Sequence, residues 1–275
     1  MKQVFFIPLG GLLLVAGVVL GQTVMPTADE IIHKANHMAL YQGADTKANV
    51  AMVITDKQGR VRKRAFSSLR KNDDNLDRNQ KYYTFFQAPA DVRKMTFMVH
   101  KHADLEKDDD RWLYMPSLDL VKRISASDKR TSFVGSDFLY EDISGRSPED
   151  DFHEMVEMTE DYYVIKNTPK NPDSVEFAHY TARIDKKTFL PMKIEFFKKD
   201  GRAYRVIESL QVDAIQAEQN GQPVTYPTVT VSIAKNLESG STTKMFVSNV
   251  RYNVGIRDDI FSERYLRRPP RDVMR

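Results

Sequence analysis

The chain has 275 residues, with 41 Lys and Arg against 38 Asp and Glu, a net charge of +3 and no cysteine. Such balanced charge does not favour nucleic-acid binding, and the lack of cysteine excludes disulfides and thiolate metal ligands. The length suffices for one large β domain or two smaller ones with a sizeable core.

The N-terminus has the pattern of an export signal. Lys2 is followed by an uncharged run, Val4–Leu20, and small residues come next at Gly21 and Thr23. A charged start, an apolar segment and a small-residue exit are typical of a signal peptide. We therefore expect residues 1–23 to be a signal peptide, cleaved after Gly21 or Thr23, and the protein to be periplasmic. A retained membrane anchor is the alternative, although the run is near the lower length limit for a span.

One helix is predicted at the start of the mature chain. Thr27 and Glu30 have the T-x-x-E spacing of a capping box. Apolar residues then recur at helical spacing, at Ile31, Ile32, Ala35, Met38 and Ala39. Gly43 is suited to the position after a helix C-cap. The pattern predicts a helix of about four turns, Ala28–Gln42, that buries one stripe.

Beyond this helix the apolar period changes to two. Val50, Met52 and Ile54 alternate with Ala51, Val53 and Thr55, and a turn at residues 56–59 leads into a second strand. In that strand Arg60, Arg62, Arg64 and Arg70 share one side, which we expect to face water. Further strands are predicted at Lys81–Gln87, Thr96–His102, Arg111–Met115, Tyr162–Lys166, His179–Asp185, Met192–Lys198, Ala203–Leu210, Thr228–Ala234 and Lys244–Tyr252.

Two other segments differ from the strands. Ser125–Phe152 is irregular and is expected to contain short helices, and Asp258–Leu266 has the charge pattern of a short helix. The basic tail Arg264–Arg275 could contact an anionic lipid surface or an acidic partner. A solvated, frayed tail is the alternative.

About ten or eleven short strands with hairpin turns predict a mainly β fold with helices, built on an antiparallel sheet that curls. We expect residues 24–275 to form this single domain, with the Ala28–Gln42 helix on the concave side. Helices that cover the concave side without filling it would leave an apolar ligand site. If they fill it, the same face is an ordinary core.

Candidate catalytic and metal-binding residues are few. His100 and His102 share a strand face near Asp104 and Asp108–Asp110. A divalent site is conceivable there, but the spacing does not fix three ligands and a solvated strand end explains the pattern. His33 and His37 lack the glutamate of H-E-x-x-H, and no nucleophile elbow, P-loop or dinucleotide motif is present. No metal, cofactor or enzymatic activity is predicted.

The segment Asp109–Asp142 resembles the outer-membrane lipoprotein-sorting protein family, in the LolA-like group often found beside RND-type transporters. The resemblance consists of an aromatic strand ending in proline, a basic turn and a Ser-Phe-x-Gly-Ser-Asp-Phe-x-Tyr-Glu-Asp run. The matching residues are Trp112, Leu113, Tyr114 and Pro116, then Lys122, Arg123 and Ile124, then Ser132, Phe133, Gly135, Ser136, Asp137, Phe138, Tyr140, Glu141 and Asp142. The C-terminal Asp258–Leu266 is also similar to the family's ending.

This resemblance implies an unclosed antiparallel β-barrel with a helical lid, which binds the acyl chains of a lipid or lipoprotein and acts with an RND-type envelope transporter. Within the motif, Trp112 and Tyr114 should share one strand face and Leu113 and Met115 the other. The candidate apolar contacts are Ile32, Ala35, Met52, Phe85, Phe97, Trp112, Tyr114, Phe133, Phe138, Tyr140, Ile194, Phe196 and Val231.

A carrier is therefore the preferred function, with the Ser125–Phe152 insert as a gate. An adaptor subunit of a transporter, which would need no ligand, is the first alternative. Its docking surfaces would be the basic tail and the Arg-rich strand, Arg60–Arg70. A lipid-acting hydrolase is the second alternative.

Overall fold

The computed structural model describes residues 1, 25–74, 77–102, 104, 107–125 and 128–270. The expected signal peptide lies, apart from its first residue, outside the described residues, as do the last five residues of the basic tail. Within the described part of the chain, no helix has both the length and the hydropathy that crossing a membrane requires.

The N-terminal helix begins as predicted and ends differently. Helix α1, Ala28–Asn36, has a capping box, in which Thr27 Oγ1 accepts from Glu30 N (3.2 Å) and Glu30 Oε2 accepts from Thr27 N (2.7 Å). It continues as a π-helical turn, η1, His37–Tyr41. The expected single helix is thus two pieces, because the Arg70 guanidinium binds the carbonyls of Leu40 and Gln42 at its end.

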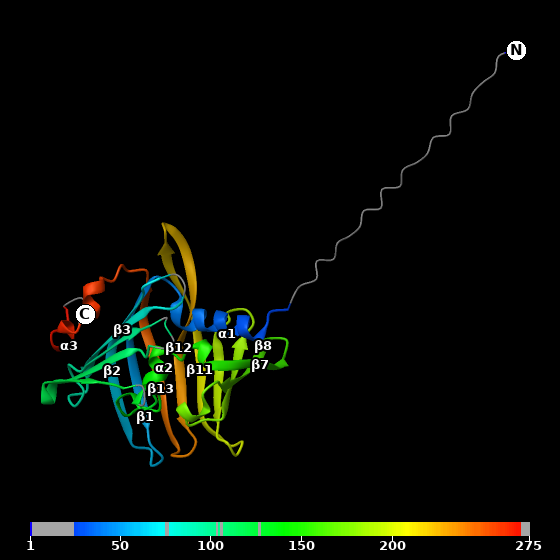
Figure 1. The fold of residues 1–275 in the computed structure, drawn as a ribbon. Helices are drawn as coiled ribbons and strands as arrows, with labels where there is room; N and C mark the ends of the chain where they lie inside the picture. Colours follow the sequence, from blue (N-terminus) through cyan, green and yellow to red (C-terminus); the bar gives the residue numbers. More distant parts are fainter. Residues whose placement is uncertain (2–24, 75–76, 103, 105–106, 126–127, 271–275) are drawn as a thin grey trace.

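In the part of the chain that the structure describes, thirteen strands form one antiparallel sheet in the order β6-β5-β4-β3-β2-β1-β13-β12-β11-β10-β9-β8-β7 (Figure 1). Strand β13 pairs with β1, and β6 and β7 are the edges, so the sheet is not closed. The bounds are β1 Asp45–Thr55, β2 Val61–Asn72, β3 Gln80–Ala88, β4 Thr96–Lys101, β5 Asp110–Met115, β6 Leu120–Arg123, β7 Asp151–Met158, β8 Tyr162–Pro169, β9 His179–Asp185, β10 Pro191–Phe197, β11 Ala203–Gln219, β12 Gln222–Asn236 and β13 Ser241–Tyr252. The predicted unclosed antiparallel architecture is confirmed, and β6 and β7 were not anticipated.

Short helices lie in the connections between strands and at the C-terminal end of the chain. They are η2 Pro116–Leu118, η4 Phe133–Gly135, α2 Tyr140–Ser144, η5 Pro148–Asp150, η6 Pro172–Ser174, η7 Asp258–Phe261 and α3 Arg264–Arg267. We call residues 132–145 the lid and residues 256–267 the strap. The expected C-terminal helix is therefore two short turns, because Ser262 between them has extended backbone angles.

The lid and the strap cover opposite faces of strands β2–β5. On the inner face, the lid packs on a core that includes Met52, Phe66, Phe86 and Phe97. On the outer face, strap residues pack on side chains that include Leu69, Tyr83, Phe85 and Met98. Leu113 belongs to the inner core and Trp112 and Tyr114 pack on the outer one, so the predicted alternation in this strand is confirmed. This half of the sheet is buried on both sides.

The arginines of β2 correct a prediction. The side that carries Arg62, Arg64 and Arg70 is the inner one and not a wet outer face, because Arg64 lies directly opposite Met52. Arg64 is only 7% exposed, and its guanidinium pairs with Asp91 (3.1 Å). Long arginine stems can pack along apolar surface when the guanidinium finds a partner.

Two strands extend beyond the sheet. Residues 211–230 of β11 and β12 pair with each other, whereas β10 pairs with β11 only up to Glu208 and β12 pairs with β13 only from Val231. The turn at Asn220 and Gly221 has positive φ at both residues, as a tight hairpin requires. This arm projects past the other strands (gold in Figure 1).

Candidate functional site

Aromatic side chains of the lid occupy the inner face of the sheet. Phe133 has no exposed surface. Its ring centroid lies 6.0 Å from that of Phe66, 5.8 Å from Phe86 and 5.5 Å from Phe97. Tyr140 packs edge-on against Phe133 at 5.3 Å. Such offset aromatic pairs bury large apolar areas with defined geometry.

This packing differs from the expected open hollow. The lid fills the apolar inner face instead of covering it, so in this conformation an acyl chain could reach the face only by displacing lid side chains. The physical reason is that an apolar face is more stable when it is buried against other side chains than when it contacts water.

Polar contacts hold the lid at its edges. Asp137 N donates to Thr243 Oγ1 (2.9 Å), and the Asp137 carboxylate accepts from Thr243 Oγ1 (2.7 Å) and from Ser241. Asp142 caps α2 by accepting from Leu139 N (2.6 Å) and forms an ion pair with Arg205 of β11. Burial raises the pKa of Asp142, and the Arg205 guanidinium acts in the opposite direction. These contacts tie the lid to the half of the sheet that contains β11 and β13.

A further carboxylate of the motif sits among three cations. Glu141 lies 3.5 Å from Lys129 Nζ, 3.5 Å from Arg146 and 3.9 Å from Arg130. Other basic residues of the motif pair elsewhere, Lys122 with Asp128 and Arg123 with Asp110. The acids of the family motif therefore serve mainly to position the lid.

The lid backbone contains one unfavourable residue. Val134 has φ +52 and ψ +39, in the left-handed region, where a β-branched side chain is strained. Gly135 follows with φ +76, which glycine adopts without penalty, and its carbonyl accepts from Arg62 (3.2 Å). The closed lid thus stores strain at Val134, and such strain is often found at moving or functional segments.

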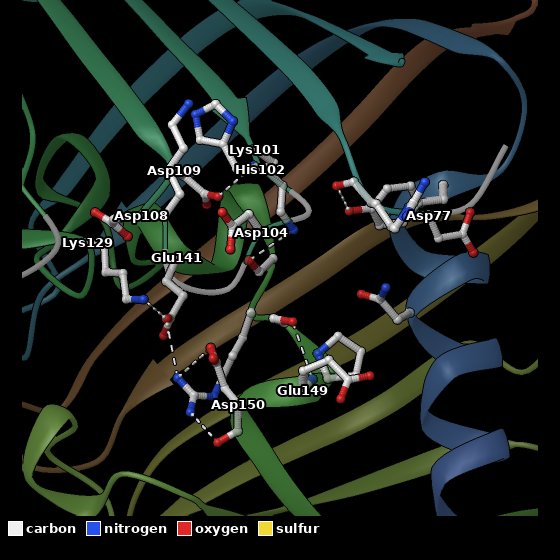
Figure 2. A pocket seen from close by; sticks show the side chains of 18 of the residues that line it. Asp77, Lys101, His102, Asp104, Asp108, Asp109, Lys129, Glu141, Glu149 and Asp150 are labelled. Carbon is white, nitrogen blue, oxygen red and sulfur yellow. Dashed lines mark hydrogen bonds and ion pairs between the residues drawn. The ribbon is translucent and has the colours of Figure 1, made fainter. Parts of the chain in front are cut away.

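A cavity of about 560 Å³ lies beside the lid, between α1, the end of β4 and η5 (Figure 2). Its lining is charged. The carboxylates include Asp77, Asp108, Asp109, Glu141, Glu149 and Asp150. Figure 2 shows Lys101 from β4 and Glu141 from α2 reaching toward the same space. Across it, α1 is joined to η5 by His33 and Glu149 (3.2 Å).

A polar belt crosses the inner face where the cavity meets the sheet. Arg70, Tyr82, Val99 and Arg111 are directly paired positions on β2 to β5 and therefore share one face. Lys101 lies two residues beyond Val99 on the same face, opposite Gln80, and is 8% exposed. Burial lowers the pKa of Lys101 to about 8. The inner face is therefore amphiphilic, with apolar residues under the lid and polar residues at the cavity.

The thirteen predicted contact residues fall into several groups, and none of them lines this cavity. Five are in the inner core: Met52, Phe97, Phe133, Phe138 and Tyr140. Phe85, Trp112 and Tyr114 lie under the strap on the outer face. Ile32 and Ala35 pack on β8 and β9, Ile194 and Phe196 belong to a cluster around Phe177, and Val231 is half-buried on β12.

The histidines considered for a metal site make other contacts. His100 Nε2 donates to the Phe261 carbonyl (2.8 Å), and His102 Nε2 lies 2.8 Å from Asp110. Among the residues with described positions, no group of three or more His, Asp or Glu is arranged to hold a metal ion.

The comparisons with known proteins identify the family. A family model with the description "uncharacterized protein" matches residues 78–268. The fold is similar to a DUF1329 family protein from Desulfovibrio piger, with 26% identity, a TM-score of 0.76, and 87% of this chain and 97% of that chain covered. It is also similar to a domain from Vibrio parahaemolyticus named for outer membrane lipoprotein sorting, with 25% identity, a TM-score of 0.74, and 88% and 98% covered.

The chain belongs to the LolA-like outer-membrane lipoprotein-sorting protein family. A LolA superfamily protein from Nitrosomonas europaea shares the fold at 22% identity, with a TM-score of 0.65 and 88% of this chain and all of that chain covered. No curated protein matches this LolA-like chain by sequence. The resemblance of the Asp109–Asp142 segment is thus confirmed.

Sequence reasoning missed the polar belt. Arg70 was assigned to a wet strand face, and Lys101 and Arg111 were placed in strands without a predicted role, because single basic residues in strands are usually solvated. Their burial depends on how four strands align. The spacing of Val99 and Lys101 was the available signal, since residues two apart in a strand share a face.

Proposed function

We propose that this LolA-like protein is a periplasmic carrier that binds the acyl chains of a lipid or lipoprotein on the inner face of its sheet. The observation that carries the proposal is the lid. Its aromatic side chains occupy an apolar sheet face, and polar contacts at its edges hold it there against the backbone strain at Val134. Ligand and lid would compete for the same surface.

The energetics fit such an exchange. An 18-carbon chain gains on the order of 10 kcal/mol on burial, at ~0.8 kcal/mol per methylene before entropy costs. Opening the lid exposes Phe133, Phe138 and Tyr140 and breaks its edge contacts, so the closed state opposes binding. A carrier needs this balance, because cargo must be released when the equilibrium shifts toward closure.

The proposed tail contacts centre on the inner core: Met52, Phe97, Phe133, Phe138 and Tyr140. Contact of the other eight candidates with a ligand stays a prediction that requires movement of α1, of the strap or of the sheet end. An export signal, periplasmic location and an RND-type transporter as donor or acceptor are also proposed, on the resemblance and on the N-terminal sequence.

An adaptor without a ligand is the second candidate. It is favoured by one observation, the complete burial of Phe133 in the closed lid, which leaves the inner face packed. For an adaptor the lid would be a permanent part of the core.

A lid-locking disulfide separates the two candidates. The chain has no cysteine, so Asp137→Cys with Thr243→Cys places one pair where lid and β13 side chains touch. The protein is expressed in cells with its full chain, purified, and extracted for lipids by mass spectrometry. Each protein is then incubated with lipid vesicles, and its bound lipid is measured. We expect stoichiometric lipid in the wild type and in the reduced double variant, and no lipid taken up by the oxidised variant.

The two single-cysteine variants are the matched controls for lost side chains. A lipid-free wild type under all conditions contradicts the carrier and supports the adaptor. Equal lipid uptake by the oxidised and reduced forms contradicts the lid as gate.

A further inference from the structure

Buried polar atoms without partners are concentrated in the polar belt. Among the described residues, five buried side-chain atoms lack a hydrogen bond, and four of them are Arg70 Nε, Gln80 Oε1, Tyr82 OH and Arg111 Nε. An unsatisfied buried polar group destabilises the fold. Their clustering on neighbouring strands, in paired register, is unusual for a face that serves only as a core.

Lys101 makes one hydrogen bond and lies 5.7 Å from the centroid of the Tyr41 ring. Its Nζ donates to the Gly145 carbonyl (3.3 Å), and no ion pair joins it to a carboxylate among the described residues. Arg111, by contrast, binds Asp109 (2.5 Å) and lies near Asp108 (3.4 Å). Both cations line the 560 Å³ cavity. An ammonium held in this way can donate a charge-assisted hydrogen bond to an anionic oxygen of a ligand.

Carboxylates also line the cavity. Those of Asp77, Asp108, Glu149 and Asp150 each remain partly exposed, although each lies beside a histidine or an arginine. A ligand with negative charge alone would meet repulsion from them. A ligand that carries a phosphate and an ammonium a few atoms apart matches both sets of charges.

The apolar face begins directly beside this cavity. Along one face of β4 the order is Lys101, Val99, Phe97. Val99 and Phe97 are fully buried in the inner core under the lid. One strand therefore presents, within five residues, a cation at the cavity and the surface proposed for acyl chains.

We propose that the cavity binds the zwitterionic headgroup of a phospholipid, with the phosphate at Lys101 and Arg111 and the ammonium at the partly exposed carboxylates. The inference rests on the proposed carrier function and names its ligand class. The headgroup fixes one end of the molecule, and its acyl chains run from Val99 toward Phe97 as the lid gives way.

The test uses four ligands that separate headgroup from tail: dioleoyl phosphatidylethanolamine, dioleoyl phosphatidylglycerol, dioleoylglycerol and phosphorylethanolamine. The full chain is incubated with each, and bound ligand is quantified by native mass spectrometry. We expect the wild type to prefer phosphatidylethanolamine over phosphatidylglycerol and dioleoylglycerol by tenfold or more. Lys101→Met should weaken phosphatidylethanolamine about tenfold and leave dioleoylglycerol unchanged, and Lys101→Arg should restore most of the preference.

Lys63→Met, an exposed lysine on the outer side of β2, is the matched control and should change nothing. Glu149→Gln provides a second variant at the cavity. It should reduce the preference for phosphatidylethanolamine over phosphatidylglycerol. Two outcomes overturn the headgroup site and leave the carrier function standing. They are equal binding of the three dioleoyl ligands and equal weakening of all three by Lys101→Met. Phosphorylethanolamine binding as tightly as the whole lipid overturns the link to acyl chains. No binding of any dioleoyl ligand overturns the carrier function itself.

Discussion

The two covers of strands β2–β5 differ in how they are held. The strap on the outer face is fixed by hydrogen bonds from buried side chains of the sheet to its backbone, such as Tyr83 OH to Tyr265 O (2.5 Å) and Thr96 Oγ1 to Leu266 O (2.8 Å). Its ion pairs, such as Lys71 with Asp258 (3.2 Å), involve an exposed carboxylate. The lid on the inner face depends on a buried ion pair and contains Val134 in a strained conformation. The strap has the character of permanent structure and the lid that of a removable part.

The largest expected effect is on the lid's ion pair. Asp142→Asn leaves the Arg205 guanidinium, in a residue 5% exposed, without a compensating charge. We expect a loss of about 3–5 kcal/mol in unfolding free energy, measured by urea denaturation, because an uncompensated buried charge is costly. The double variant Arg205→Met with Asp142→Leu should recover most of it. A loss below about 1 kcal/mol for Asp142→Asn would mean that the pair does not hold the lid.

Leu266→Ala tests the strap. Leu266 is fully buried, so its truncation should cost roughly 2–5 kcal/mol and raise amide exchange in β3–β5. Leu237→Ala, at a residue 49% exposed, should cost less than about 0.5 kcal/mol. The contrary outcome is a strap that opens, as is proposed for the lid. In that case Leu266→Ala will raise amide exchange in the strap without a matching loss of unfolding free energy.

Lys101 on the inner face should lower the free energy of unfolding in a pH-dependent way. Its pKa is lowered to about 8 in the folded state from 10.5, so the unfolded chain binds the proton more tightly. Stability from this group therefore rises as pH increases from about 8 to 10.5. Lys101→Met should be more stable than the wild type by at most about 3 kcal/mol at pH 7.

That difference between Lys101→Met and the wild type should shrink as pH rises through the same window, and urea unfolding at a series of pH values measures it. Lys63→Met on the outer side should show no such trend. A constant difference across the window would show that Lys101 does not carry a buried charge.

The smallest effect is expected at Val134. Val134→Gly removes the left-handed penalty, which is about 1–2 kcal/mol for a residue with a Cβ, and loses part of this gain to glycine's flexibility. We expect a net stabilisation of the closed lid of about 1 kcal/mol or less, seen as slower amide exchange in the lid. Val134→Ala keeps the Cβ and should not stabilise. Faster lid exchange in Val134→Gly would show that the valine side chain outweighs the strain.

Local patterns predicted much of the fold. The Thr27–Glu30 capping box, the alternation of Trp112, Leu113 and Tyr114, and the unclosed antiparallel sheet followed from residue spacing, hairpin signals and the family motif. Strand β7 was missed because its sequence, Asp151–Met158, is rich in acidic residues, and edge strands need not be apolar. The two strands of the arm were predicted too short. They extend beyond their neighbours, which is a property of the sheet and not of either strand.

The candidate site was less predictable. The sequence named apolar residues of the right chemistry, and the structure distributes them over both faces of the sheet. The cavity itself is polar, and the only local signal for its key cation, Lys101, was that it shares a strand face with Val99. Faces of a two-sided buried sheet cannot be told apart from alternation alone, because both sets of side chains are covered.

The sequence by itself determined the class of fold, the family and the residues that build the lid, since capping, alternation and a long motif act through neighbours in the chain. The tertiary structure alone decided that the lid fills the inner face, that the strap covers the outer one, and that Arg70, Lys101 and Arg111 come together beside a charged cavity. The reason is physical: burial and charge compensation depend on which distant strands become neighbours.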